Sequence, residues 1–124
     1  MKLVFLNLFF LAASVLADDA LSEPYDVKLR ELRADQSAQV SVRDGWTIAL
    51  TEDGRTIWSF TPEDHPAHPA YAERRLSQDA QGAWLVQTNL KCGGPRKECD
   101  KLHAQYEALD VQMRKSINGS DNGT

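Results

Sequence analysis

The hydrophobic pattern changes its period once near the C-terminal end, and this change constrains the fold more than any other feature. Between residues 84 and 92, apolar side chains alternate with polar ones, as in a β-strand with one buried face. After Gly93-Gly94-Pro95 they recur every three or four residues, as on one face of a helix. The strand face comprises Trp84, Val86, Thr88, Leu90 and Cys92, and the helix stripe comprises Cys99, Leu102, Tyr106, Leu109, Met113 and Ile117. An apolar helix stripe needs a cover, so this helix should pack across the sheet.

Turn signals upstream predict a β-meander. Asp44-Gly45 and Glu52-Asp53-Gly54 are turn sequences, and the segments around them are rich in β-branched and aromatic residues. The alternating residues of these segments are Val40 and Val42, then Trp46, Ile48 and Leu50, then Thr56, Trp58 and Phe60. Segment 61–70 contains three prolines and is predicted to be a loop. Residues 71–77 follow as a polar, edge-like strand, and residues 79–82 as a further turn.

Residues 25–32 fit two patterns. Tyr25, Val27 and Leu29 alternate as in a strand, whereas Tyr25, Leu29 and Leu32 also lie on one face of a helix. We favour a strand for this segment.

The fold class predicted from these patterns is α+β. The expected architecture is an antiparallel β-meander of four to five strands with one C-terminal amphipathic helix packed across it. A single domain is expected over residues 18–117. Residues 118–124 are only Gly, Asn, Ser, Asp and Thr, which predicts a disordered tail that stops the helix. Asn118 and Asn122 in this tail begin N-glycosylation sequons, whose use the sequence leaves open.

The N-terminal segment has the pattern of a secretory signal peptide. Lys2 precedes an apolar run from Leu3 to Leu16, and small Ala17 stands before two aspartates. This run is short for a membrane span. We therefore expect residues 1–17 to be removed and the protein to be secreted or periplasmic, with no membrane attachment after cleavage.

The charge of the predicted mature chain disfavours nucleic acid as a partner. Without Lys2, 13 Lys and Arg face 18 Asp and Glu, a net charge of −5. Phosphate binding depends on clustered cations. The basic pairs Arg74-Arg75 and Arg96-Lys97 are too small to form such a cluster, and we expect both to be solvated surface.

The two cysteines are predicted to form a disulfide. Cys92 ends the inward face of the last strand, and Cys99 begins the inward stripe of the helix. An even cysteine pair in an exported protein is usually a disulfide. Six residues separate the two, rather than the two residues of a redox motif or zinc knuckle. The bond would join the sheet to the helix.

The Pro/His loop, residues 61–70, holds the only candidate metal or acid–base cluster. His65 and His68 are weak candidates for zinc or copper ligands, because Pro66 and Pro69 extend the backbone and no third ligand stands at a characteristic spacing. We expect no metal and no cofactor. A surface loop stiffened by proline suits partner recognition better than catalysis. The candidate partner-binding residues are Trp58, Phe60, Pro62, His65, His68 and Tyr71.

No catalytic motif is visible in the chain. It contains no Gly-rich phosphate loop, metalloprotease helix motif or recognisable nucleophile–base arrangement. We therefore predict a small exported non-enzymatic binding or accessory protein, an inhibitor or immunity-type partner of another protein. The alternatives are a metal-binding protein that uses the Pro/His loop, or a small envelope enzyme.

One stretch resembles known sequences. Residues 56–69, Thr-Ile-Trp-Ser-Phe-Thr-Pro-Glu-Asp-His-Pro-Ala-His-Pro, together with Cys92 and Cys99, resemble a group of small exported proteobacterial proteins of unassigned function. The resemblance covers about half of the predicted mature chain. It implies export and brings no biochemical role with it.

Overall fold

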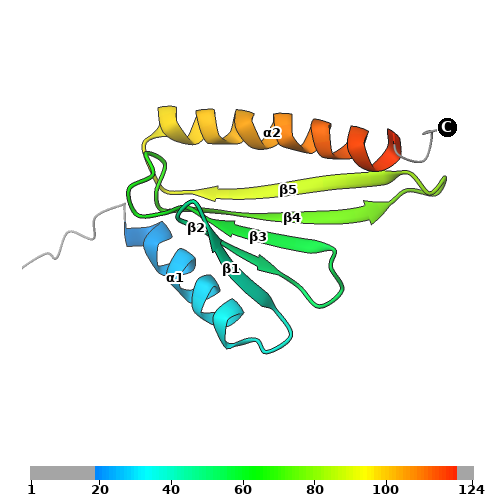
Figure 1. Cartoon of the computed structure of the whole chain (residues 1–124). Coiled ribbons are helices and arrows are strands. Elements are labelled where there is room, and N and C mark those ends of the chain that lie inside the picture. Colours follow the sequence, from blue (N-terminus) through cyan, green and yellow to red (C-terminus); the bar gives the residue numbers. More distant parts are fainter. Residues whose placement is uncertain (1–18, 120–124) are drawn as a thin grey trace, which may run out of the picture.

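The computed structural model of the chain describes residues 19–119, which form two helices and five strands (Figure 1). The predicted signal peptide and the end of the predicted tail lie outside these residues. The elements in order are α1 (Asp19–Ala34), β1 (Gln39–Arg43), β2 (Trp46–Leu50), β3 (Thr56–Phe60), β4 (Ala70–Gln78), β5 (Trp84–Cys92) and α2 (Arg96–Gly119). The predicted α+β class is confirmed.

The five strands form one antiparallel sheet in the order of the chain, as the turn signals predict. Asp44 and Gly45, with φ of 51° and 83°, make the two-residue turn that brings Arg43 opposite Trp46. Gly54, with φ of 68°, lies in the turn before β3. Because each turn is local, neighbouring strands in the chain are neighbours in the sheet.

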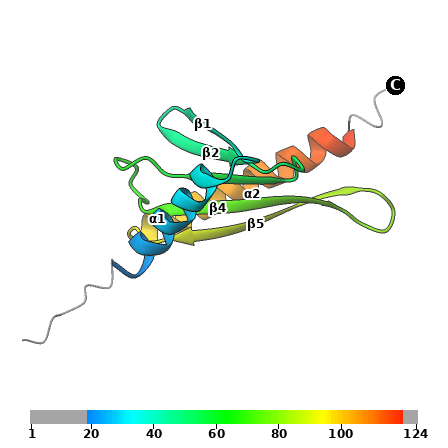
Figure 2. The ribbon, with the colours of Figure 1, turned by 90° about the horizontal axis from the view of Figure 1, so that it is seen from below.

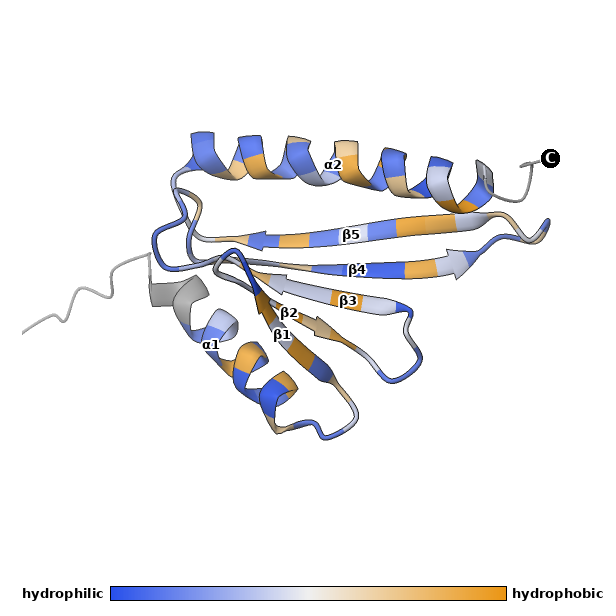
Figure 3. Cartoon of the chain, in the orientation of Figure 1, coloured by the Kyte–Doolittle hydropathy of each residue, from blue (hydrophilic) through white to orange (hydrophobic). Residues whose placement is uncertain are grey.

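Helix α2 packs on one face of the sheet and runs along β5 and β4 (Figure 1). Leu102 and Tyr106 are its buried residues. They pack with Ala67, Ala70 and Ala72 in one core cluster. The helix presents its apolar side to the strands (Figure 3), which confirms the predicted packing of the C-terminal helix across the sheet.

The segment predicted as a first strand is helix α1, so that prediction is wrong. Tyr25 and Leu32 lie on one side of α1 and pack with Ala49 and Phe60 on the face of the sheet opposite to α2 (Figure 2). The residues that fit the helical pattern, Tyr25, Leu29 and Leu32, are thus the ones that pack against the sheet. The physical reason is that both faces of the sheet carry apolar side chains, so a second helix has a surface to cover.

Two further boundaries differ from the sequence predictions. β4 lies between β3 and β5 rather than at an edge, because β5 pairs along its whole length. Helix α2 continues through Asn118 and Gly119, which the sequence pattern places in the tail. The Asn118 side chain accepts a hydrogen bond from the Trp84 N–H at 2.8 Å and donates one to the Trp84 carbonyl at 3.1 Å, and this contact to β5 favours the extra turn.

Within residues 19–119, no helix combines the length and the apolar character needed to span a bilayer.

Candidate functional site

The Pro/His loop is folded tightly onto its neighbours. Tyr25 of α1 donates a hydrogen bond to the Thr61 carbonyl at 2.5 Å. The Thr61 hydroxyl bonds both the N–H and the carbonyl of Ala70, each at 3.1 Å, which closes the base of the loop. Burial raises the pKa of Tyr25, against the opposing effect of its bond to Thr61. The loop therefore connects α1 to the sheet through hydrogen bonds.

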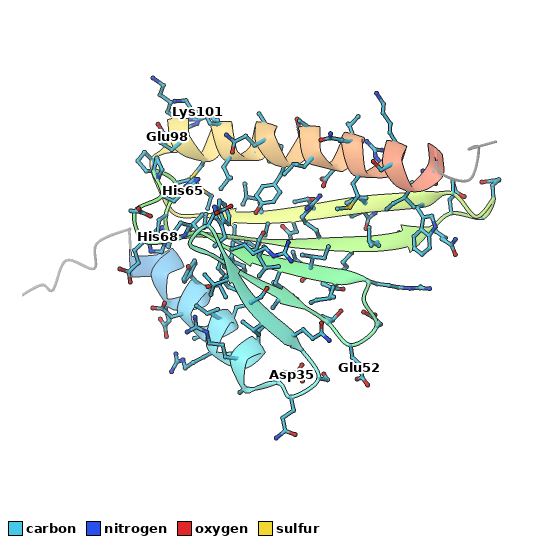
Figure 4. All side chains as sticks on the ribbon, in the orientation of Figure 1. Asp35, Glu52, His65, His68, Glu98 and Lys101 are labelled. Atoms are coloured by element: carbon cyan, nitrogen blue, oxygen red, sulfur yellow. A yellow bond between two sulfur atoms is a disulfide. The ribbon has the colours of Figure 1, made fainter. Side chains whose placement is uncertain are left out.

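The two histidines of the loop lie against different layers (Figure 4). The His65 ring packs edge-on against Trp46, with centroids 5.2 Å apart. The His68 ring packs edge-on against Tyr25 at 5.1 Å, and its Nδ1 lies 2.9 Å from the Thr61 hydroxyl. Each ring has its own packing partner. In residues 19–119, no three His, Cys, Asp or Glu side chains gather as a metal site would require.

The aromatic members of the predicted partner-binding set lie beneath α1. Phe60 is fully buried, and the rings of Trp58, Phe60 and Tyr71 stack in a row on this face. Lys28 of α1 lies over the Trp58 ring at 5.1 Å. Phe60 is therefore a core residue and cannot touch a partner. Pro62, with His65 and His68, is half-buried. A partner-binding role for the loop stays a prediction.

The predicted disulfide between Cys92 and Cys99 is present, with an S–S distance of 2.08 Å. It closes the corner between β5 and α2. Gly94 in this corner lies so close to the Pro/His loop that a Cβ atom there would stand 2.5 Å from the Ala67 carbonyl oxygen. The disulfide is compatible with an oxidising extracellular or periplasmic compartment.

An apolar groove opens between α2 and strands β2 and β3. The right-handed twist of the sheet turns β1–β3 away from α2, which follows β4 and β5 (Figure 1). The groove has a volume of about 240 Å³. Its lining residues are Trp46, Ile48, Ile57, Ser59, Arg74, Leu102, Gln105, Tyr106 and Leu109. Leu109 stands at its rim with 47% of its surface exposed.

Three polar residues that line the groove, Ser59, Arg74 and Tyr106, have hydrogen-bond partners in the described chain. The Tyr106 and Ser59 hydroxyls are 2.5 Å apart. Arg74 donates from Nε and Nη2 to Asp110 Oδ1 at 3.2 and 3.0 Å. Thr88 donates to Asp110 Oδ2 at 2.5 Å. Burial raises the pKa of Tyr106, while its bond to Ser59 acts in the opposite direction.

The sequence patterns do not predict this groove as a site, although five of its nine lining residues lie on predicted apolar faces. The periodicities predict Ile48 on one face of its strand and Leu109 on the apolar stripe of its helix, and both residues line the groove. The prediction that Arg74 is solvated surface is wrong, because its side chain is only 12% exposed and pairs with Asp110. Alternate residues of a strand share a face, so Arg74 lies on the same face of β4 as Ala72. This spacing was the signal in the sequence that could have indicated burial of Arg74.

Comparison with known proteins gave no match: no protein-family model fits the chain, and no curated protein or solved structure is similar to it. The resemblance to small exported proteobacterial proteins stays a prediction. The groove and the loop are therefore the observations from which a function can be inferred.

Proposed function

We propose that this protein is a secreted or periplasmic, non-enzymatic binding protein that holds an apolar side chain of another protein in the groove beside α2. The observation that carries this proposal is the groove itself. Large apolar side chains from two layers, among them Trp46, Ile57 and Leu109, line an open cavity instead of packing against each other. Exposed apolar cavities of this kind are typical anchor sites for a partner.

The size of the groove favours a protein partner over a small molecule. Its volume of about 240 Å³ lies below the roughly 300–1,000 Å³ of ligand pockets that enclose a small molecule. It suits one or two large apolar side chains of the kind that anchor protein interfaces. The partner would carry such an anchor on a surface that also contacts α2.

The chemistry of the groove supports binding rather than catalysis. Arg74 is neutralised by Asp110, and Tyr106 is bonded to Ser59. An enzyme site usually keeps an unpaired acid, base or nucleophile directed at the substrate. A role as an inhibitor, immunity or envelope-accessory protein fits this arrangement, since such proteins act by occupying a partner.

Leu109→Lys tests the proposal. The change places a charge at the rim of the groove without disturbing the core, because Leu109 is already half exposed. Val111→Lys is the matched control. Val111 has a similar exposure of 41% on the same helix, and it does not line the groove.

The measurement is selection of displayed peptides and of envelope proteins from the source organism on the immobilised protein. We expect a reproducible set of binders with a shared large apolar residue, retained by Val111→Lys and weakened at least about tenfold by Leu109→Lys. Binders that Leu109→Lys and Val111→Lys retain equally well would refute the assignment of the groove. Turnover of a substrate by the purified protein would refute the non-enzymatic role.

A further inference from the structure

β1 is an exposed edge strand of the sheet. It pairs with β2 on one side, and all five of its residues are exposed. Val42, at 66%, is the most exposed large apolar side chain in residues 23–119. Apolar residues colour much of this strand in Figure 3. The strand contains no proline, and its only charged residue is Arg43 at the turn, so no charge interrupts the Val40–Val42 segment.

The turn geometry shows which backbone groups of β1 face outward. A two-residue turn joins Arg43 to Trp46, so these two residues exchange both of their backbone hydrogen bonds. Because the bonding pattern alternates along an antiparallel pair, Ser41 bonds β2 in the same way. The N–H and C=O groups of Val40 and Val42 consequently point to the free edge.

The other edge of the sheet, β5, is capped at its first residue, which β1 is not. At the start of β5, the Asn118 side chain of α2 takes both the N–H and the carbonyl of Trp84. Lys91 is an exposed charge near its end, as Arg43 is at the end of β1. Within the described chain, no side chain covers the outward groups of Val40 and Val42, and both stand beside exposed apolar side chains.

We propose that β1 pairs with β1 of a second copy of this chain, antiparallel about a two-fold axis at Ser41. In this register each Val40 faces Val42 of the second copy, and each of these pairs exchanges two backbone hydrogen bonds. Gln39 faces Arg43 of the second copy, so no like charges meet. The segment Gln-Val-Ser-Val-Arg is thus complementary to itself, which a two-fold interface requires.

The dimer formed in this way is weak and depends on concentration. A pair of five-residue strands buries less than the roughly 1,200 Å² of a stable interface. It joins the two sheets into one and leaves the groove beside α2 free in both copies. This inference is independent of the proposed function, and Leu109→Lys should dimerise like the wild type.

Introducing a charge at Ser41 tests the dimer. Ser41 faces Ser41 of the second copy at a closely spaced, non-hydrogen-bonded position, so Ser41→Lys or Ser41→Glu alone places like charges directly opposite each other. We expect either variant to weaken dimerisation at least about tenfold in sedimentation velocity. An equimolar mixture of the two should restore it. Gln87→Lys, which adds the same charge at an exposed site on β5, should leave it unchanged.

Val42→Pro gives a second test if the Ser41 variants fold poorly by circular dichroism. It removes an outward N–H of the edge, where proline is tolerated in a single strand, and should abolish the dimer. A wild type that stays monomeric at millimolar concentration overturns the proposal. So does a dimer that survives both the Ser41 and Val42 changes, or single-charge variants that fail to recover on mixing, because each result requires another surface or another register.

Discussion

The ion pair between Arg74 and Asp110 should be a main contribution of polar groups to the docking of α2. The two side chains are only 12% and 14% exposed. Asp110 accepts two bonds from Arg74 and one from Thr88. We predict that Asp110→Ala lowers the free energy of unfolding by about 3 kcal/mol, because it leaves the guanidinium mostly buried without its carboxylate.

The magnitude follows from the contacts. Removing one partner of a fully buried pair costs about 3–5 kcal/mol, and the residual exposure places this pair at the lower end. Asp110→Asn keeps acceptor and donor atoms in place and loses only the charge, so we expect a loss of about 1–2 kcal/mol. Replacing both residues by apolar ones of similar size, Arg74→Met with Asp110→Leu, should cost less than the sum of the single changes.

The assay is urea denaturation followed by tryptophan fluorescence, with the urea dependence compared between variants. Glu107→Ala is the control, since Glu107 on the same helix is 70% exposed and pairs only with His103 in the described chain. It should change stability by less than about 0.5 kcal/mol. An Asp110→Ala loss no larger than that of Glu107→Ala would refute the reasoning, because it would mean that water screens the pair fully.

Three further predictions concern the corner and the core. Replacing Cys92 and Cys99 together by Ser should lower stability by about 2.5 kcal/mol, the chain-entropy value for a closed loop of eight residues, while the circular dichroism spectrum is retained. Gly94→Ala should cost about 1–3 kcal/mol in the same urea assay, because its Cβ meets loop backbone; Gly119→Ala, with open space around it, should be harmless. Burial raises the pKa of Tyr106 above its ordinary value of 10.0, so the stability that this residue contributes is present below that pH and is lost as pH rises through the folded pKa. In urea denaturation at increasing pH, Tyr106→Phe should reduce the fall of the unfolding free energy in the alkaline range. An equally steep fall in wild type and variant would contradict the assignment.

Local signals in the sequence determined the elements whose patterns are complete within a few residues. The turn at Asp44-Gly45 needs only a backbone that tolerates positive φ. The alternation in β5 and the stripe in α2 each predict an element and its buried side, and together they place Cys92 next to Cys99. These predictions succeeded because strand and helix periods depend on the chain's own geometry.

Only the tertiary structure decided what covers each face. Residues 25–32 suited strand or helix, and the choice was made by distant partners, including the Thr61 carbonyl that Tyr25 bonds across 36 residues. The sequence predicts a solvated Arg74, and only the packing of α2 on the sheet places Asp110 beside it. The groove and the open β1 edge arise from the twist of the sheet beneath a straight helix and from the order of its strands. Exposure and charge pairing depend on which element lies opposite a side chain, and the spacing of residues along the chain carries no record of that.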